Sequence, residues 1–574
     1  KYLGIEEAAF DQLVLTSPAQ PFLARGVELY SRSLIEGAAD HSAWSALLSE
    51  VSGPGIHASW RRAVLLALVR SEAAAEVLKT AEPVLTAADS ALLNELVRTT
   101  MAVDAQPARE LFAEAGLDVS LMPDSLTVPS GPSWLRLIAW LLKLDDKIPG
   151  GSIPAVVDLF TSWSVGMLGF DNITPHLLRR LYRWLTTIEA AWKRGYYRER
   201  SKLFGGVLSA DQIGSLREDI RRGFAMFANR VPDLAVAYLA AAKDREDREQ
   251  IASAIHKFRG ALAAAAPDEL ADLFGAALIQ EPKKDERDDD FGGGYRDRAF
   301  TLLDSSFLPV SPAQGPFVDL LKARPETGKR LVRKLVDHAI KAETHGYNGS
   351  PETIEIQMPE GVRRFLWPHT IIWSREAGSR YHAVTSGLMA LEGWGHERID
   401  AGEAVDAVIA DIIGTGDTPA AYLMIAIDLV LSHWPASKTA AVSFVANPQL
   451  LVMDRTRQAR EHVEFPDIFG LKAIQREPTG PITAASLAAR PSRDASLEVL
   501  LKFYTFDEEA DHRERAVALL EAARATLDEP TPESNLGDPE FMVLHALNQL
   551  DPANWQPREV ELEDGSKAEV REYV

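Results

Sequence analysis

The stretch SWRRAVLLALVRSEAAAEVLKTAE, residues 59–82, determines the fold class that the sequence predicts. Its apolar residues recur every three or four positions, which is the spacing of one buried face of an α-helix. Ser59 is expected to be the N-cap, and Pro83 is expected to end the helix. The next stretch, TAADSALLNELVRTTMAV at 86–103, repeats this pattern after a short gap. Two amphipathic helices joined by a short turn predict an antiparallel helix pair.

Stretches of the same kind follow one another along most of the 574 residues, and the gaps between them are short. Many antiparallel helices with short connections form either a compact bundle or a stack of helix hairpins. The sequence contains no clean fixed repeat. We predict an all-α fold, namely a helix-hairpin array of the HEAT- or armadillo-like α-solenoid kind.

Two segments depart from the helical spacing and alternate apolar with polar residues instead. TIEIQMPEGVRRFLWPHTIIW at 353–373 alternates on both sides of a Pro-Glu-Gly turn, and REVELEDGSKAEVREYV at 558–574 alternates around Asp-Gly. Alternation interrupted by such turn residues is typical of a β-hairpin. We therefore predict two small β-hairpin insertions.

The segment EPKKDERDDDFGGGYRDR, residues 281–298, joins a charge run to three glycines and contains few apolar residues. This composition predicts a flexible linker and a domain boundary. The sequence then divides into five predicted parts. They are an N-terminal helical segment 1–125, a helical array 126–280, the linker 281–298, a helical domain 299–475 that contains the hairpin 353–373, and C-terminal helices with a final hairpin 476–574.

The charge balance limits the partners that the protein can bind. The 61 Lys and Arg residues face 83 Asp and Glu residues, which gives a formal net charge of −22. A uniformly acidic surface repels nucleic acid and anionic membranes, so contact with either requires a local patch of positive charge. Cysteine is absent, which excludes disulfides, thiolate metal ligands and cysteine nucleophiles. That composition is typical of a cytosolic protein, so we predict a cytoplasmic location.

The apolar run at 420–434 is too short to span a bilayer, and it contains Asp428. We predict a buried core helix there and no membrane contact. A buried carboxylate must be paired or protonated, so Asp428 is expected either to pair with an arginine or to serve a functional site. Because the chain opens with Lys1 and stops within a predicted strand, we expect it to be a piece of a longer protein.

The octapeptide ARPETGKR at 323–330 contains Gly-Lys, which raises the question of a phosphate-binding loop. Such a loop needs an earlier glycine, a hydroxyl residue after the lysine, and a strand before it. Here Ala323 and Arg330 occupy the glycine and hydroxyl positions, and the preceding segment has helical spacing. We predict a turn between two helices.

No other linear motif predicts catalysis, a cofactor or a metal. His382, Glu392 and His396 share one expected helix, but His382 lies nearly three turns from the other two, and a metal site needs a third ligand nearby. No nucleophile motif is present either. We predict no catalytic, cofactor-binding or metal residues, and an enzyme with a dispersed site remains an alternative.

One segment reverses the acidic balance of the chain. Residues 176–230 contain twelve Lys and Arg against five Asp and Glu, with aromatic residues between them. Cations interleaved with aromatics suit phosphates and stacked bases, but a basic patch also docks on acidic protein surfaces. We predict a protein contact here, either with acidic neighbours in the same chain or with a partner, and nucleic acid or another polyanion is the alternative. The expected contact residues are Arg179, Arg180, Arg183, Lys193, Arg194, Tyr196, Tyr197, Arg198, Arg200 and Lys202.

The hairpin at 353–373 is the second predicted contact surface. Its second strand and the residues after it carry two cations and a large aromatic side chain, which suit a protein interface. The expected contact residues are Arg363, Arg364 and Trp367.

Three segments, 311–340, 353–402 and 418–435, together resemble a known kind of region. They are similar to the helical region that follows the nucleotide-binding domain in large bacterial multidomain P-loop NTPases of anti-phage defence, of the STAND- and AAA-like type. The resemblance implies that nucleotide is bound elsewhere, while the helical array senses a ligand, holds a partner or builds an oligomer. The Walker residues of that family have no counterpart in this chain.

We therefore predict a non-catalytic recognition or scaffold array, the sensor or oligomerisation part of a bacterial NTPase-based defence protein. The expected partner is another protein or its own NTPase domain, and a homo-oligomer is also open. The alternatives are a nucleic-acid-binding helical module and an enzyme with a dispersed site. The sequence does not identify the ligand, the oligomeric state or the pathway.

Overall fold

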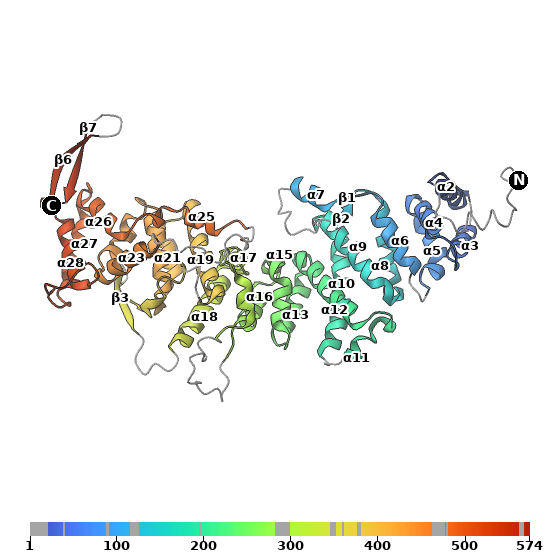
Figure 1. Ribbon diagram of the computed structural model, residues 1–574, viewed down its shortest axis with the longest axis horizontal. Coiled ribbons are helices and arrows are strands. Elements are labelled where there is room, and N and C mark those ends of the chain that lie inside the picture. The colour runs from blue at the N-terminus through green and yellow to red at the C-terminus, as the bar shows by residue number, and fades with distance from the viewer. Residues whose placement is uncertain are drawn as a thin grey trace. The chain divides into compact units, whose positions relative to one another are not determined.

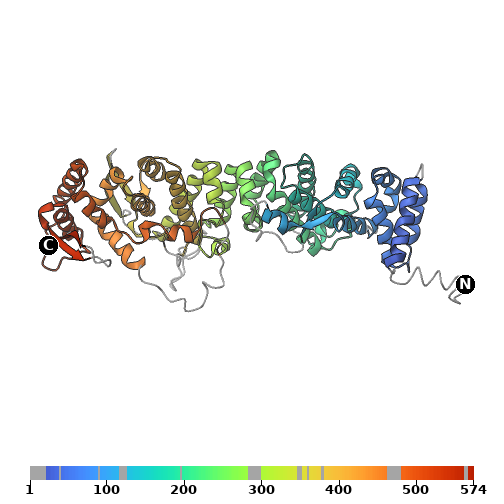
Figure 2. The ribbon, with the colours of Figure 1, turned by 90° about the horizontal axis from the view of Figure 1, so that it is seen from above.

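The computed structural model of the protein consists mainly of α-helices (Figures 1 and 2). It divides into two compact units, which are described separately. Unit 1 comprises residues 1–238 and 257–265, and unit 2 comprises residues 239–256 and 266–574. The structure describes residues 21–37, 41–87, 91–114, 126–193, 197–281, 299–344, 352–358, 361–375, 380–461, 477, 480–561 and 567–573.

In unit 1, consecutive helices alternate with short connections. The elements are α2 (Pro21–Gly37), α3 (Ser42–Val51), α4 (Ala58–Arg70), α5 (Ala74–Leu85), α6 (Ala91–Met101), β1 (Ala105–Pro107), α7 (Ala108–Glu114), β2 (Thr127–Pro129), α8 (Ser133–Leu144), α9 (Ile153–Gly166), α10 (Thr174–Lys193), α11 (Tyr197–Arg200), α12 (Ala210–Met226) and α15 (Arg259–Ala265). The helix α13 (Pro232–Lys243) contributes its first part to unit 1 and its last residues to unit 2.

Unit 2 contains the remaining helices and most of the strands. The helices are α14 (Arg248–Ile255), α16 (Pro267–Leu278), α17 (Phe317–Ala323), α18 (Pro325–Glu343), α19 (His382–Asp400), α20 (Val405–Ile413), α21 (Ala421–Ser432), α22 (Lys438–Val445), α23 (Pro448–Glu461), α25 (Ala484–Ala488), α26 (Leu497–Thr505), α27 (Ala510–Arg524) and α28 (Pro539–Leu550). The strands are β3 (Thr353–Met358), β4 (Gly361–Leu366), β5 (Thr418–Pro419), β6 (Trp555–Glu561) and β7 (Lys567–Tyr573).

Helices in unit 1 contact the helix two or three places along the chain as well as their sequence neighbour. α2 packs on α4, α4 on α6 and α6 on α9, while α3 packs on α5 and α5 on α8. Alternate helices therefore form two layers of stacked helix pairs, which is the arrangement of α-solenoid repeats. The predicted all-α helical array is confirmed.

The segment 59–82 forms two helices rather than the single helix that we predicted. α4 ends at Arg70, Ser71 adopts an extended conformation, and α5 starts at Ala74. The N-cap is His57, whose ring accepts the backbone N–H of Ser59, and Pro83 lies inside α5. The apolar spacing is compatible with both arrangements, because a short break leaves each helix its own buried face.

Both predicted β-hairpins are present. β3 pairs antiparallel with β4, and β6 pairs antiparallel with β7. Two features differ from the prediction: residues 368–370 form a 3-10 turn, and β5 adds a parallel third strand beside β4. The sequence analysis also missed the two-stranded pair of β1 and β2, because strands of three residues leave no recognisable alternation.

The core of unit 2 is built around α19 and α21. Every residue from Ala421 to Leu431 is buried, which confirms that the apolar run at 420–434 forms a core helix. The N-terminus of α19 is capped from a distance, because the Asp304 carboxylate accepts the backbone N–H groups of His382 (3.1 Å) and Ala383 (2.7 Å). Such a cap satisfies donors that a helix start leaves open.

The octapeptide 323–330 forms the turn between α17 and α18, as predicted, and α18 begins at Pro325. Gly328 is buried where these two helices meet. A β-carbon at this position would lie 2.8 Å from the backbone nitrogen of Leu321. The glycine is therefore required for close packing of the two helices, not for holding a phosphate.

The predicted linker 281–298 lies outside the described residues apart from Glu281. The division between the two units falls earlier, between residues 238 and 266. The other predicted boundaries, at 125, 475 and 476, stay predictions. Across the described ranges, none of the helices combines the length and the apolar character needed to cross a bilayer.

Replacing Gly328 tests the close approach of α17 and α18. We expect Gly328→Ala to lower the free energy of unfolding by about 1–3 kcal/mol, because the methyl group must displace the Leu321 backbone. The matched control is Gly26→Ala in α2, where no atom lies within 4 Å of the new β-carbon. That change should stabilise the helix by about 1 kcal/mol. Urea denaturation measures both values, and equal stabilities for the two variants would contradict the packing.

Candidate functional site

The predicted basic-aromatic surface corresponds to α10, α11 and α12. Its cations divide into buried and exposed groups. Arg180 is 6% exposed and pairs with Asp145 and Asp146, whose side chains are exposed, so its own guanidinium is covered and presents little positive charge to a partner. Arg183 is exposed and also pairs with Asp145, at 2.8 Å. The sequence could not show this pairing, because the aspartates lie 38 residues away.

Two further arginines of this segment are buried around one glutamate. Arg217 donates two hydrogen bonds to Glu189, at 3.1 and 2.9 Å, and Arg221 contacts the same carboxylate at 2.6 Å. All three side chains are less than 10% exposed. A buried carboxylate shared by two guanidinium groups holds α10 against α12. These cations are therefore unavailable to a polyanion.

The exposed part of the surface is centred on Trp192. The guanidinium groups of Arg200 and Arg217 lie 3.7 Å and 4.2 Å from the centre of its ring. Two cations close to one indole form cation–π contacts that fix the ring. Arg200 thereby anchors the short helix α11 to α10.

Trp192 and Arg200 also line a surface groove with a volume of about 630 Å³. The remaining lining comes from α12 and includes both signs of charge. These residues are Ala210, Asp211, Gly214, Ser215, Glu218, Asp219 and Arg222. Three carboxylates and two guanidinium groups give the groove a slightly acidic, mixed-charge character, whereas a phosphate backbone selects for a surplus of cations.

A second groove of about 500 Å³ lies beside the first, between α10 and α11. Lys202, one of the predicted contact residues, lines it and pairs with Glu199 at 2.9 Å. Both grooves flank α11, so the predicted surface is hollowed on two sides of one short helix.

The structure places the other predicted contacts as follows. Arg179 is exposed on α10. Arg194 and Tyr196 lie outside the described residues, as do the side chains of Lys193, Tyr197 and Arg198. The described part of the surface therefore consists of Arg179, Arg183, Arg200 and Lys202.

The predicted hairpin contacts bind within their own unit. Arg363 donates to the carbonyl oxygens of Gly414 and Gly416, both at 2.9 Å, and Arg364 pairs with Asp417 at 2.7 Å. Trp367 packs edge-on against His369. These arginines fasten the hairpin to the loop before α21, so they support the sheet as well as facing solvent.

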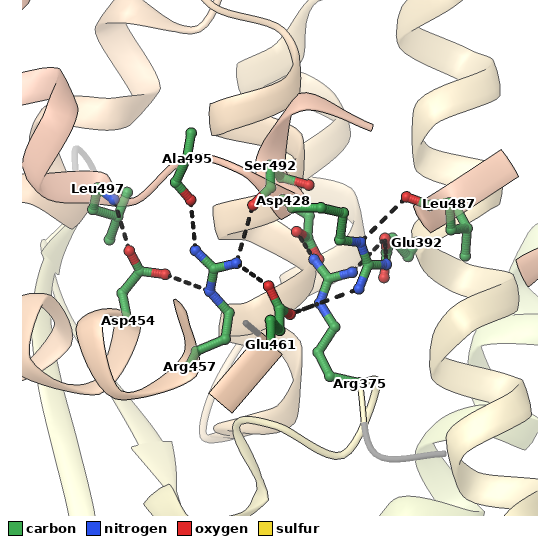
Figure 3. Close-up of polar contacts among 11 residues, drawn as sticks. Arg375, Glu392, Asp428, Asp454, Arg457, Glu461, Leu487, Ser492, Ala495 and Leu497 are labelled. Carbon is green, nitrogen blue, oxygen red and sulfur yellow. Dashed lines mark hydrogen bonds and ion pairs between the residues drawn. The ribbon is translucent and has the colours of Figure 1, made fainter. Parts of the chain in front are cut away.

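The densest cluster of charged groups in unit 2 is buried and was not predicted as a unit (Figure 3). Arg457 is fully buried on α23 and donates to Asp454 (2.8 Å) and Glu461 (2.6 Å). It also donates to the backbone carbonyls of Ser492 and Ala495, at 3.0 and 2.7 Å. One side chain thus joins α23 to the segment that leads into α26.

The second half of this buried charge network is centred on Arg375. Its guanidinium contacts Asp428 of α21, Glu392 of α19 at 3.5 Å and Glu461 at 3.3 Å (Figure 3). Arg493 reaches Glu392 at 3.1 Å. Burial raises the pKa of Glu392, while the Arg375 charge opposes that shift. Three arginines and four carboxylates therefore connect α19, α21 and α23.

The network answers the question of Asp428. Of the two expectations, the structure provides the arginine partner, because Arg375 lies against its carboxylate. The sequence showed a carboxylate in an apolar helix, but the partner is 53 residues earlier in an irregular segment. Only the fold could bring the two together.

The three residues considered for a metal site are separated. His382 contacts Asp304 (3.0 Å), Glu392 belongs to the buried charge network, and His396 contacts His433 at 2.9 Å. In the described part of the chain, no three His, Asp or Glu side chains converge as metal ligands would.

Comparisons with known proteins add little to this description. No protein-family model matches the chain, and no curated protein sequence matches it. One solved structure, from work described as "A conserved phosphorylation switch controls the interaction between cadherin and beta-catenin in vitro and in vivo", covers 94% of this chain and 100% of its own. The identity is 10% and the TM-score is 0.18, so this similarity supports no conclusion about fold or function.

Removing the central arginine tests the buried charge network. We expect Arg457→Met to lower the free energy of unfolding by about 3–5 kcal/mol, because Asp454 then remains buried without its counter-charge. Arg364→Met is the matched control, since it breaks an exposed ion pair that contributes little to stability. Urea denaturation of the intact chain distinguishes them, and an Arg457→Met loss as small as that of the control would refute the network's role.

His396 makes the stability of unit 2 dependent on pH. Burial, aided by Arg490 and His433, lowers the pKa of His396 from 6.5 to about 3, and Asp400 opposes this shift. Between these values the unfolded chain binds a proton that the folded imidazole does not, so stability falls as the pH falls from 6.5 to 3. Above pH 6.5 both states are neutral there, and His396 has no effect.

We expect His396→Phe to reduce the slope of unfolding free energy against pH by about 1.4 kcal/mol per pH unit within that window. Thermal and urea denaturation at several pH values measure the slope. The unchanged His433, whose pKa is also lowered by burial, keeps part of the dependence. A slope identical to that of the wild type would show that His396 titrates normally in the fold.

Proposed function

We propose that the protein is a non-catalytic recognition array that binds a protein partner through the α10–α12 surface. The observation that carries this proposal is the mixed-charge groove beside Trp192. Asp211, Asp219 and Arg222 are exposed around a ring that is held in place by two arginines. Aromatic and arginine anchors bordered by charges of both signs are typical of protein interfaces.

The distribution of charge favours a protein over nucleic acid as the partner. Arg180, Arg217 and Arg221 supply a large part of the positive surplus in 176–230, and all three are buried in ion pairs. The groove itself is lined by three carboxylates and two guanidinium groups, so it is slightly acidic. A nucleic-acid-binding helical module therefore remains the alternative, with Arg179 and Arg183 as its candidate phosphate contacts.

We further propose that this array is the sensor or scaffold part of a bacterial NTPase-based defence protein, as the resemblance of 311–340, 353–402 and 418–435 suggests. In support, these segments lie together in unit 2. α17 and α18 pack on α19, α19 packs on α21, and β5 joins the sheet of the hairpin. Segments that form one packed group are suited to act as one functional region. The partner would then be another protein or the NTPase domain itself.

The enzyme alternative needs ionisable groups that converge on an accessible space. The buried charge network consists of arginines and carboxylates that form ion pairs with one another (Figure 3). This arrangement favours a structural role for the network, in which it holds the helices of unit 2 together, over a catalytic role.

Peptides selected from a displayed random library against the purified chain test the recognition surface. We expect fluorescence polarisation of a selected peptide to show binding that Arg222→Glu and Asp219→Lys each weaken about five- to thirtyfold, the effect of losing about 1–2 kcal/mol. Arg32→Glu on α2, an exposed arginine of the same unit, is the matched control and should bind as the wild type does. Arg180 is unsuitable for such a test because its reversal would bury an unpaired charge.

A single-stranded oligonucleotide provides the opposing measurement. The nucleic-acid alternative is correct if the oligonucleotide binds, if its affinity falls steeply with salt, and if Arg179→Glu and Arg183→Glu make this salt dependence less steep. Peptide binding that is indifferent to both groove variants would reject the proposed surface.

A further inference from the structure

The C-terminal hairpin of β6 and β7 forms a two-stranded sheet that no third strand of the described chain joins. It extends away from the neighbouring helices (Figure 1), and the described residues 556–559 of β6 are exposed. Contacts with the helices are at its base. The Trp555 indole donates to the Gln549 carbonyl at 2.8 Å and packs on Phe506, which the Arg571 guanidinium also covers at 4.9 Å.

An isolated two-stranded hairpin is only marginally stable in water, and three or more strands are usually required. Each of its strands also has an outer side that no strand of the described sheet pairs with, and such edges present backbone N–H and C=O groups to another strand. The distal part of this hairpin therefore has two edges to which another strand can be added.

The two edges are not equivalent, because β6 contains Pro557. Proline has no N–H, so it belongs at a position whose N–H would point away from the partner strand. Pro557 is opposite Arg571. In an antiparallel ladder, residues that lie opposite each other form hydrogen-bonded and non-hydrogen-bonded pairs in turn. If Pro557 and Arg571 are a non-hydrogen-bonded pair, residues 567, 569, 571 and 573 of β7 point their backbone N–H and C=O groups away from β6. The outer edge of β6 is interrupted by the proline, whereas the outer edge of β7 is continuous.

The sequence of β7, KAEVREY, has no net charge and alternates in sign. Two copies of this strand can pair antiparallel with Val570 of one copy opposite Val570 of the other. Residue 569 of each copy, a glutamate, then lies opposite residue 571 of the other copy, an arginine. A register shifted by two residues places either two glutamates or two arginines opposite each other. Like charges directly opposite are destabilising, so the charges select one register.

We propose that β7 is a dimerisation edge at which a second copy of this chain pairs antiparallel about Val570. Two copies then form a four-stranded sheet in the order β6-β7-β7-β6, and outward groups on each β7 exchange about eight backbone hydrogen bonds. This proposal is independent of the α10–α12 surface, since the two involve different units and different measurements.

The absence of cysteine from the chain makes a direct test available. In this register the two Val570 residues face each other as a non-hydrogen-bonded pair, with Cα atoms about 4.5 Å apart, which a disulfide can bridge. We expect Val570→Cys to form a disulfide-linked dimer rapidly under mild oxidation. Arg558→Cys, at the position opposite Val570 on β6, is the matched control and should remain largely monomeric.

Charge reversal tests the register without a cross-link. Sedimentation equilibrium of the wild type should show a concentration-dependent dimer, and Glu569→Arg should weaken it about tenfold or more because it places arginines opposite each other. The double variant Glu569→Arg with Arg571→Glu restores the opposite charges and should restore the dimer. Circular dichroism confirms that each variant is folded.

A monomer at all concentrations, with no faster cross-linking of Val570→Cys than of Arg558→Cys, would overturn the proposal. A dimer that Glu569→Arg leaves intact would overturn it too, since its interface would lie elsewhere. A chain that stays monomeric but binds an added β7 peptide would overturn dimerisation of the intact chain, since the edge would then accept this strand only when the strand is separated from its own hairpin.

Discussion

The constraint on which this structure depends is that no helix can bury its apolar stripe alone. A helix such as α4 has seven buried side chains on thirteen residues, and it hides them by packing on α2 and α6. The same requirement applies along unit 1, where each helix packs on one that lies two or three places further along the chain. In unit 2 it reaches its extreme in α21, which is surrounded on all sides. Stacking is thus what turns individually marginal helices into a stable array.

Charged groups provide a second kind of connection, at places where apolar packing leaves segments unjoined. Glu189 between Arg217 and Arg221 fixes α10 to α12, and Arg457 fixes α23 to the chain before α26. In the first cluster the contacts join opposite charges of two helices, whereas buried Arg457 pairs with Asp454 and Glu461 of its own helix and reaches the other segment through backbone carbonyls. Such groups are costly to bury singly but specify one arrangement when paired. The charged side chains that stay exposed along the groove beside Trp192, namely Asp211, Asp219 and Arg222, are then the ones that define its surface.

Much of the architecture was predictable. The helical spacing in 59–82 and its successors gave the fold class, the Pro-Glu-Gly and Asp-Gly turns gave both hairpins, and the missing glycine at Ala323 correctly argued against a phosphate loop. The break at Ser71 was not predictable, because an apolar period of three to four residues continues across it. The short strands β1, β2 and β5 escaped for a related reason: two or three residues are too few to show alternation.

The candidate site was only partly predictable. Local composition located a segment rich in cations and aromatic residues, and that segment does border the two grooves. Composition could not show that Arg180 points inward to Asp145, or that Asp428 meets Arg375, because those partners are dozens of residues away. The sequence by itself therefore determined which segments are helices and which residues carry charge. Only the tertiary structure decided which charges are paired inside and which are left for a partner, since burial depends on what the fold places opposite each side chain.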